Sequence, residues 1–356
     1  MNTASEPSIV DAYAHVGFPR YGTADELIAI WHQWGITKGN IALPPGMPDF
    51  DALAAARDAL GRNVRLFGIP YGDNPAARLS LAELQIRFGI AGMRLMTAEI
   101  ADNPDVLDAL GEAGLCLMAI NVYDRADVTR SMIDWLERYP TGVVASPHFL
   151  RRTGIDGRAV GDAPDAGDPS RAVADPGAFR DLLRHPRMHA IFSRHGGCSG
   201  EPFPHLDLRP WVEDVVSLLG WERVMWGSEI PVIYHRDEQV DGVMGWLRAL
   251  GVEMSESEEA AYLGGNARRV FFAASGERTG APSEHAPVDF PAWVRDGLRS
   301  FIDANDPVPV IRSGPLELPL DLHGRLMSAY LVAQRANPAL TFQSWIVEQL
   351  RRGTAK

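Results

Sequence analysis

Polar side chains with acid–base or anion-binding chemistry recur at the ends of short apolar runs in this sequence. Imidazole and carboxylate groups transfer protons near neutral pH, and arginine binds a carboxylate through two parallel hydrogen bonds. The histidines, arginines, tyrosines, asparagine and glutamate at or near the run ends are Tyr13, His15, Arg94, Asn121, Tyr123, His148, Arg151, Arg194, His195 and Glu229. Single residues of these types are often structural, so their significance depends on whether the fold brings them together.

The apolar runs alternate with longer stretches of helical spacing, which predicts parallel strands joined by helices. The expected strands are residues 9–15, 40–43, 64–70, 92–96, 115–122, 143–148, 190–193 and 224–226. Eight such units over about 250 residues fit a closed (β/α)8 barrel, in which the carboxyl ends of the strands carry the active site. No G-x-G-x-x-G follows the first strand, which argues against an open dinucleotide-binding sheet.

The composition excludes several classes of protein. The 356 residues carry a formal net charge of −12, so an electrostatic grip on nucleic acid or an anionic membrane is not expected. Two cysteines, Cys116 and Cys198, are too few for a disulfide framework. Residues 1–7 have no basic region before an apolar stretch, and no run is long enough for a membrane helix. We therefore expect a cytoplasmic protein.

Two segments interrupt the alternation. Residues 154–176 are rich in Gly, Asp, Pro and Ala and follow the sixth expected strand, so either a lid or a surface insertion fits them. Residues 274–284 are polar and indicate a domain boundary. The expected division is a barrel over 1–273, a linker with a helix over 274–307, and a small module over 308–356.

Four segments resemble signatures of the amidohydrolase-related family. Residues 9–15 read IVDAYAH where the family usually has D-x-H-x-H, and 92–95 match its fourth-strand G-x-R-L. Residues 224–231 read VMWGSEIP where it has G-S-D-x-P, and 262–271 are similar to its closing helix. The resemblance spans about residues 8–273. It implies a barrel that hydrolyses or decarboxylates small organic acids, often around one divalent metal ion.

The metal ligands that the resemblance implies are mostly replaced here. Tyr13 stands where the first histidine of the family pattern lies, the expected strand 115–122 has no histidine, and Glu229 replaces an aspartate. Only His15 and Glu229 remain, whereas catalytic zinc generally has three protein ligands. We therefore expect no tightly bound metal. A divalent metal such as zinc on His15, Glu229 and an unidentified ligand is the alternative.

The residues that remain resemble the metal-free branch typified by 2-pyrone-4,6-dicarboxylate lactonase. By position, His148, Arg151 and Arg94 inherit the roles that this branch gives to a histidine and two arginines around a carboxylated lactone. The substrate-binding residues expected on this basis are Arg94, Arg151, Tyr123, Arg194 and His195. The alternative is that Arg94 and Arg151 pair with acidic residues across the barrel mouth.

The expected catalytic residues are Glu229, His148, His15 and Tyr13. In this scheme Glu229 activates water, while the two histidines and Tyr13 polarise the carbonyl or protonate the leaving oxygen. The predicted function is metal-independent hydrolysis of a small carboxylated substrate, such as a lactone or related cyclic ester. A metal-dependent decarboxylase or amidohydrolase and an inactive barrel that serves as scaffold or sensor stay open. So does a Cys198 nucleophile assisted by His195.

The end of the chain resembles a ribbon-helix-helix module. Residues 310–318 would form the ribbon, and two helical patterns follow, separated by Asn337-Pro338. Such modules pair strand to strand, so we expect a homodimer. Residues 308–356 carry six basic and three acidic side chains, a weak excess for binding DNA, so a dimerisation role is favoured over nucleic-acid contact.

Overall fold

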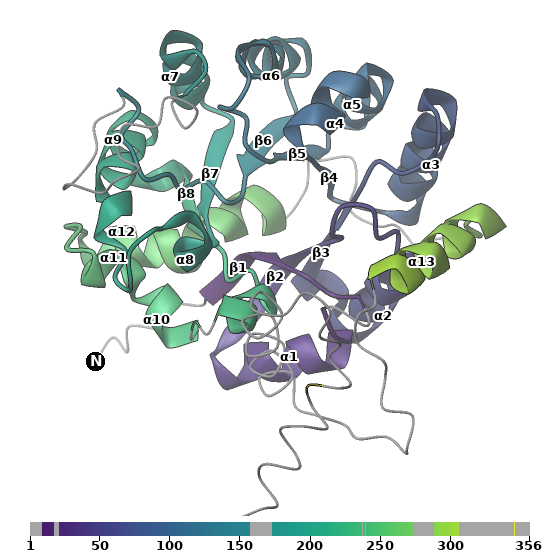
Figure 1. Cartoon of the computed structure of the whole chain (residues 1–356), viewed down its shortest axis with the longest axis horizontal. Coiled ribbons are helices and arrows are strands. Elements are labelled where there is room, and N and C mark those ends of the chain that lie inside the picture. Colours follow the sequence, from purple (N-terminus) through teal and green to yellow (C-terminus); the bar gives the residue numbers. More distant parts are fainter. Residues whose placement is uncertain are drawn as a thin grey trace, which may run out of the picture.

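Eight parallel strands in chain order form the centre of the molecule, and helices surround them as a ring (Figure 1). The computed structural model describes residues 9–17, 21–156, 173–236, 238, 240–273, 288–305 and 345. Its strands are β1 (Ile9–Ala14), β2 (Ile36–Ala42), β3 (Val64–Gly68), β4 (Gly92–Leu95), β5 (Cys116–Ala119), β6 (Val143–Ser146), β7 (Met188–Phe192) and β8 (Val224–Trp226). All eight predicted strands are confirmed, with ends shifted by a few residues.

The last strand returns to the first at the carboxyl end of the sheet. The backbone N–H of Glu229 donates to the carbonyl of Tyr13 at 2.7 Å, just past the end of β8. The buried Asp11 carboxylate on β1 accepts a hydrogen bond from the backbone N–H of Ser228 at 2.9 Å and another from its hydroxyl. These contacts tie β1 to β8, and the predicted (β/α)8 barrel is confirmed.

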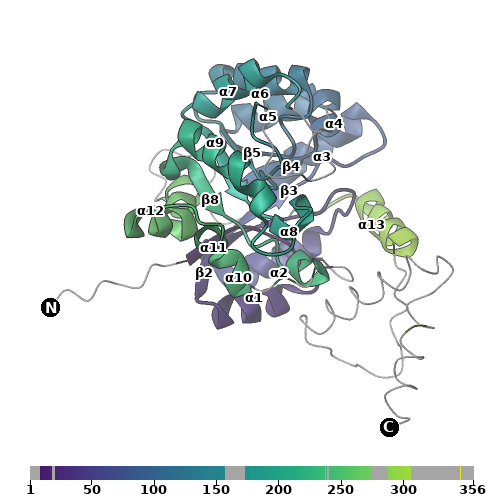
Figure 2. The same ribbon diagram turned by 60° about the vertical axis from the view of Figure 1, so that its left-hand side comes forward.

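Helices form the outer ring of the barrel (Figure 2). Sequence signals for helix starts mark where several of these helices begin. Thr23 and Glu26 form a capping box at α1, and prolines at the first helical position follow the capping residues Asn74 and Asp175. The longer helices are α1 (Ala24–Gln33), α2 (Phe50–Leu60), α3 (Pro75–Phe88), α5 (Pro104–Glu112), α6 (Ala126–Arg138), α7 (Pro176–Arg184), α9 (Arg209–Leu219) and α13 (Ala292–Asn305). The short ones are η1 (Gly61–Asn63), α4 (Thr97–Asp102), α8 (His195–Cys198), η3 (Leu206–Leu208), η4 (Trp221–Arg223), η5 (Val232–Arg236), α10 (Val240–Met244), α11 (Trp246–Ala249), α12 (Glu256–Ala260), η6 (Ala261–Gly265) and η7 (Arg268–Phe272).

The helical segment from α12 to η7 closes the amino end of the barrel. Phe271 packs edge-to-face on Phe67 from β3, with ring centroids 5.8 Å apart, among the side chains that fill the barrel interior. The buried Asn266 amide donates to the carbonyls of Trp221 at 2.6 Å and Val224 at 2.8 Å, which holds the segment against the start of β8. Since this end is plugged, ligands reach the barrel interior from the carboxyl end.

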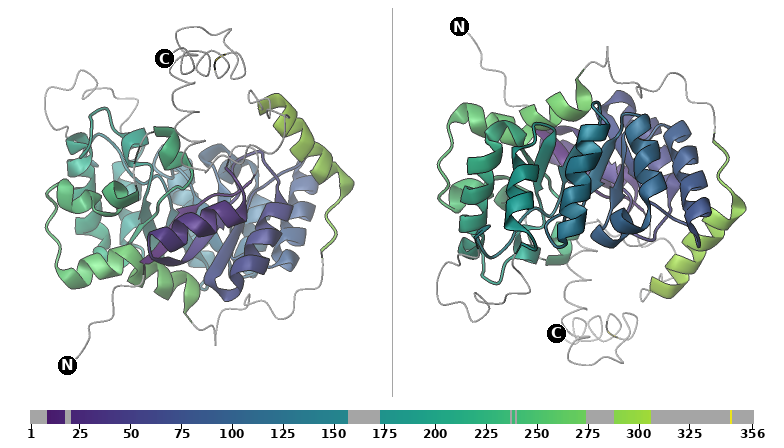
Figure 3. Two further views of the ribbon diagram at one scale, coloured as in Figure 1. Left: turned by 90° about the horizontal axis from the view of Figure 1, so that it is seen from below. Right: turned by 90° about the horizontal axis from the view of Figure 1, so that it is seen from above.

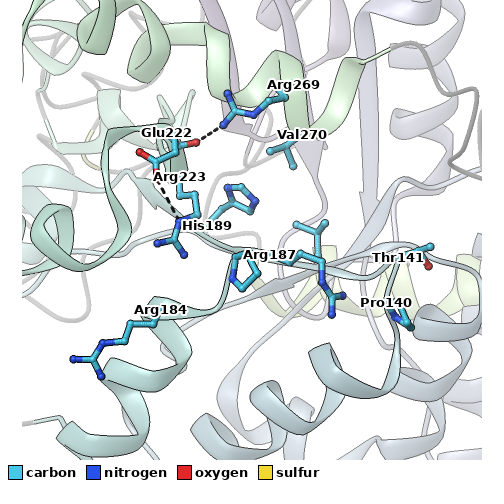
Figure 4. A pocket seen from close by; sticks show the side chains of 11 residues that line it. Pro140, Thr141, Arg184, Arg187, His189, Glu222, Arg223, Arg269 and Val270 are labelled. Atoms are coloured by element: carbon cyan, nitrogen blue, oxygen red, sulfur yellow. Dashed lines mark hydrogen bonds and ion pairs between the residues drawn. The ribbon is translucent and has the colours of Figure 1, made fainter.

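A cavity of about 720 Å³ also lies at the amino end, beside β7 and η4, and arginines line much of it (Figure 4). Two of these arginines donate hydrogen bonds to backbone carbonyls at or near helix ends. Arg187 donates to the carbonyls of Leu136, Tyr139 and Gly142, and Arg223 donates to those of Leu183, His185, Leu218 and Leu219. Because the carboxyl ends of helices carry unpaired carbonyls, this cluster stabilises the ends of α6, α7 and α9.

Helix α13 packs along the outside of the barrel near α2 and α3 (Figure 3). Phe290, just before the helix, stacks on Phe50 at 4.2 Å, and Trp293 stacks on Tyr71 at 6.0 Å. This helix lies where the sequence predicts one, whereas residues 157–172 and the predicted ribbon-helix-helix module lie outside the described residues, Trp345 apart. Among the described residues, no helix is long and apolar enough to cross a bilayer.

Candidate active site

A second cavity, of about 370 Å³, opens at the carboxyl ends of β4 to β7. The side chains that line it are mainly polar and come from the predicted strand ends. They are Arg94, Met96, Ile120, Asn121, Tyr123, Asp124, His148, Leu150, Arg151, Arg152, Arg194, Gly197 and Cys198. Four guanidinium groups therefore face one carboxylate, in a chain whose overall charge is negative.

Two of the four arginines have carboxylate partners. Arg151 pairs with Asp124 at 2.8 Å, and its guanidinium lies 4.5 Å from the centroid of the Tyr123 ring. Arg152 lies 3.8 Å from Asp207. The pairing of Arg151 with an acidic residue is the alternative that the sequence left open. These contacts fix one side of the cavity.

Arg94 and Arg194 have no carboxylate within 4.0 Å among the described residues. Arg194 is exposed at the rim, whereas Arg94 is only 5% exposed. Nε of Arg94 donates to the Tyr13 hydroxyl at 2.7 Å, and its buried Nη1 has no hydrogen-bond partner within the described part of the chain. A buried donor without a partner is unfavourable, so Nη1 of Arg94 is a group that a ligand in this cavity could satisfy.

A chain of hydrogen-bonded polar and charged side chains lies beside the cavity. His148 Nε2 is 2.8 Å from one oxygen of Glu229, and Arg236 donates to the other oxygen at 2.8 Å. Arg236 Nε also donates to Glu238 at 2.7 Å, and Glu238 in turn accepts from the backbone N–H of Gly196 at 2.6 Å. Glu229 is 2% exposed and does not line the cavity, while His148 does. Glu229 therefore reaches the cavity through His148.

The charges in this chain follow from burial and its partners. Burial alone would raise the pKa of Glu229, but His148 and Arg236 outweigh burial and hold that pKa below its ordinary value. Burial lowers the pKa of His148, and this outweighs the neighbouring Glu229 carboxylate, which raises it. These shifts favour an ionised Glu229 carboxylate and a neutral His148 imidazole near neutral pH, with Arg236 as the cation that balances the carboxylate.

Tyr13 and His15 form a buried layer beneath the residues that line the cavity. The two rings meet edge-on with centroids 4.7 Å apart, and Tyr13 also meets the His148 ring edge-on at 5.2 Å. Burial raises the pKa of Tyr13 to about 12 and lowers that of His15 to about 3, so both are neutral. Nδ1 of His15 lies 2.6 Å from the Ala42 carbonyl, to which it donates, so Nε2 is left as an acceptor.

His195 and Cys198 lie on the loop after β7. His195 is 1% exposed, packs edge-on against Trp246 at 4.5 Å and is not among the residues that line the cavity. Cys198 lines the cavity, but burial raises the pKa of its thiol to about 12. The short α8 ends at Cys198 itself, so no helix follows it as a nucleophile elbow requires. These features argue against a thiolate nucleophile.

The backbone adopts the left-handed conformation after four successive strands. The residues with positive φ there are Asn121 (56°), His148 (55°), Arg194 (64°) and Glu229 (57°), following β5, β6, β7 and β8. Non-glycine residues rarely adopt this conformation, and they concentrate at functional sites. The repeated geometry indicates that this rim positions its side chains for function.

The donor set does not fit the metal site that the family resemblance implies. No three His, Cys, Asp or Glu side chains among the described residues come together as metal ligands. Tyr13 is hydrogen-bonded to the Arg94 cation, and both oxygens of Glu229 contact His148 or Arg236. A cationic side chain thus contacts Tyr13, and another contacts Glu229.

The sequence comparison agrees with this architecture. A family model described as amidohydrolase matches residues 48–273, which is more than half of the chain. The chain belongs to the amidohydrolase family. No curated protein matches this amidohydrolase by sequence.

Solved structures share the barrel of this amidohydrolase. A Pseudomonas putida protein assigned as a 2-pyrone-4,6-dicarboxylic acid hydrolase is 21% identical, with a TM-score of 0.52 over 74% of this chain and 97% of that one. An amidohydrolase from Burkholderia multivorans is 16% identical, with a TM-score of 0.54 over 74% of this chain and 98% of that one. At these identities the likeness concerns the fold.

Sequence reasoning missed Arg236 and Glu238 in this amidohydrolase. Both follow β8 in a segment of short helical turns, and neither belongs to a motif that the resemblance covers. The available signal was their position, since an arginine seven residues after Glu229 can fold back onto it where the chain turns. They complete the ion-pair chain that holds Glu229.

Proposed function

We propose that this amidohydrolase hydrolyses a small carboxylated lactone or related cyclic ester, using the His148–Glu229 pair and no tightly bound metal ion. The observation that supports this most is the buried Arg94, whose unpartnered Nη1 shares a 370 Å³ cavity with His148. A carboxylate on Arg94 would satisfy that donor and place the rest of a small substrate beside the imidazole.

The arginine pattern supports an anionic substrate. Tyr13 accepts from Nε of Arg94 and so fixes the plane of its guanidinium, and Arg194 supplies a second cation at the rim. The Pseudomonas putida structure carries the name of a dicarboxylic acid hydrolase. A related Acinetobacter baumannii protein, 16% identical with a TM-score of 0.52, holds citric acid. Both descriptions favour carboxylated ligands in barrels of this kind.

The His148–Glu229 pair supplies the base in the proposed reaction. A water molecule adds its oxygen to the ester carbonyl carbon, and its proton passes to His148, which faces the cavity. The carbonyl π electrons move to the oxygen and form an oxyanion. Glu229, kept ionised by Arg236, stabilises the imidazolium that results. Sequence reasoning assigned the base to Glu229 itself, whereas its burial favours a role through the imidazole.

The second half of the reaction returns the proton. When the tetrahedral intermediate collapses, the bond between the carbonyl carbon and the ring oxygen breaks, and the leaving oxygen takes the proton from His148. The products are a carboxylic acid and an alcohol or enol on one opened molecule. In this scheme Tyr13 positions Arg94 and His15 packs against Tyr13, since neither of the two lines the cavity.

Divalent-metal catalysis is the second candidate. It is favoured by a form of the Burkholderia multivorans amidohydrolase that holds zinc. In the present chain the ligands would be His15, Glu229 and an unidentified third group, and the ion pair of Glu229 with Arg236 disfavours this site. Metal analysis of the active protein separates the two candidates.

The test is a turnover assay with a series of carboxylated lactones and the same lactones as methyl esters. We expect turnover of the free acids and little turnover of the esters, because the methyl esters offer Arg94 no carboxylate. Glu229→Gln is expected to lower kcat by about 100- to 10,000-fold. The control is Glu137→Gln, a glutamate on α6 whose side chain is 72% exposed. Equal activity of Glu229→Gln and wild type would overturn the proposal.

A further inference from the structure

Asn121 lies on the cavity rim between the anion-binding and proton-transferring groups. The sheet runs in chain order, so Asn121 after β5 is flanked by Arg94 on β4 and His148 after β6. All three line the same 370 Å³ cavity. Asn121 therefore lies between the group proposed to hold the substrate carboxylate and the proposed base.

The backbone at Asn121 is held in a conformation suited to this position. Its φ of 56° repeats the positive φ of His148, Arg194 and Glu229 on the following strands. Thr97 donates through its hydroxyl to the carbonyls of Ile120 and Asn121, both at 3.0 Å. The Thr97 hydroxyl thus holds the loop through its backbone carbonyls, and these contacts do not involve the Asn121 side chain.

The carboxamide of Asn121 makes no hydrogen bond with the other described residues, although it lines the cavity. The Tyr123 hydroxyl, another neutral side-chain donor among the lining residues, donates to the His148 carbonyl at 3.2 Å. Asn121 is therefore a neutral side-chain amide of this lining whose N–H groups remain available to a ligand. Cationic donors would hold the substrate carboxylate instead.

We propose that Asn121 is a catalytic residue whose Nδ2–H donates a hydrogen bond to the oxyanion formed when water adds to the substrate carbonyl. This rests on the proposed lactone hydrolysis and adds the group that receives the displaced electron pair. As the water oxygen bonds to carbon, the carbonyl π electrons move to oxygen, and the Asn121 amide faces that charge. The amide keeps its own proton, and collapse of the intermediate restores the carbonyl.

The chemistry of the Asn121 amide favours stabilisation of the oxyanion over binding of the substrate in its ground state. A neutral amide gains most where negative charge develops in a site shielded from water, and removing one such donor costs about 100- to 1,000-fold in kcat. Binding of the substrate carboxylate is already supplied by Arg94 and Arg194. Loss of the Asn121 amide should thus change kcat and leave KM nearly unaltered.

The test compares Asn121→Gly, Asn121→Ala and Asn121→Asp. The substitution Asn121→Gly removes the side-chain amide without straining the backbone, because glycine adopts a positive φ readily. Asn121→Ala removes the amide and also strains the backbone at this positive φ. The proposal expects a loss of about 100-fold or more in kcat for both, with KM within about threefold and unfolding temperature retained in Asn121→Gly. Asn121→Asp should be slower still, because its carboxylate repels the oxyanion. Wild-type kcat in Asn121→Gly would overturn the proposal, as would a loss confined to Asn121→Ala.

A binding measurement separates this proposal from the proposed function. Calorimetric titration with a carboxylated cyclic phosphonate, which mimics the tetrahedral intermediate, needs no turnover. Asn121→Gly is expected to bind this analogue at least about 100-fold more weakly than wild type while binding citrate equally well. If wild type hydrolyses no lactone, the proposed function fails, yet the titration still decides the role of Asn121. Equal affinity for the phosphonate in both proteins would overturn it.

Discussion

At the scale of single residues, a buried layer orients the residues that face the cavity. Tyr13 fixes Arg94 through a 2.7 Å hydrogen bond, and Glu229 contacts His148 at 2.8 Å while Arg236 keeps it ionised. In the proposed reaction, binding and proton transfer then fall to Arg94 and His148, which line the cavity. Substitutions in the buried layer should change the chemistry of their partners more than the shape of the cavity.

The pH dependence of turnover follows from His148. Burial holds the pKa of this imidazole below its ordinary 6.5, and protonation removes the base, so kcat/KM should be flat near neutrality. It should fall about tenfold per pH unit only below pH 6.5. In Glu229→Gln the fall should begin at still lower pH, because the carboxylate that raises the pKa of His148 is gone. Initial rates over pH 4 to about 9, corrected for uncatalysed hydrolysis, check this; a midpoint above pH 7 would contradict it.

The sequence predicts the positions of the site residues better than their partners. Strand ends locate Arg94, His148 and Glu229 because side chains at the carboxyl ends of parallel strands converge in a barrel. The contacts of Glu229 depend on the path of the loop after β8, which periodicity does not describe. The left-handed backbone conformation of Asn121 could not be predicted from the sequence either, since asparagine adopts several backbone conformations. Burial of Glu229, on which we base the proposal that His148 is the base, required the packed structure.

At the scale of elements, the two ends of the barrel have separate tasks. The carboxyl end carries the cavity, while α12 to η7 plug the amino end with Phe271. At the amino end, Arg187 and Arg223 donate hydrogen bonds to carbonyls at the ends of neighbouring helices, so these two guanidinium groups stabilise the fold. Asp11 joins β1 to β8 close to the site, and it couples barrel closure to the placement of Tyr13.

Replacement of Arg223 should destabilise the fold and spare catalysis. Its guanidinium donates to four carbonyls at the ends of α7 and α9, and leaving these unpaired should cost about 2 to 4 kcal/mol in the free energy of unfolding. Urea unfolding of Arg223→Ala measures this, with Arg295→Ala, an exposed arginine on α13, as the matched control. Equal losses in the two variants would contradict the capping role.

At the scale of the whole molecule, the described site belongs to one chain. Its members lie between Tyr13 and Glu238, all within the barrel. We propose that the chain is a cytoplasmic homodimer joined through residues 308–356, as the ribbon-helix-helix resemblance implies. Assembly would then be independent of the chemistry.

Truncation after residue 307 tests this independence. Light scattering should give the full chain a mass of about twice 39.0 kDa and the truncated chain a single-chain mass. The truncated protein retains α13 and should keep kcat/KM within about twofold, because no site residue is removed. A monomeric full chain would refute the dimer, and loss of activity on truncation would show that the tail completes the site.

Metal content measured together with activity tests most directly whether the barrel mouth works as an acid–base pocket. Protein purified without added metal and dialysed against a chelator should hold less than about 0.1 ion per chain and keep its full kcat on a carboxylated lactone. Added zinc should leave that rate unchanged or lower it. A stoichiometric ion whose removal abolishes turnover, and whose return restores it, would contradict the account.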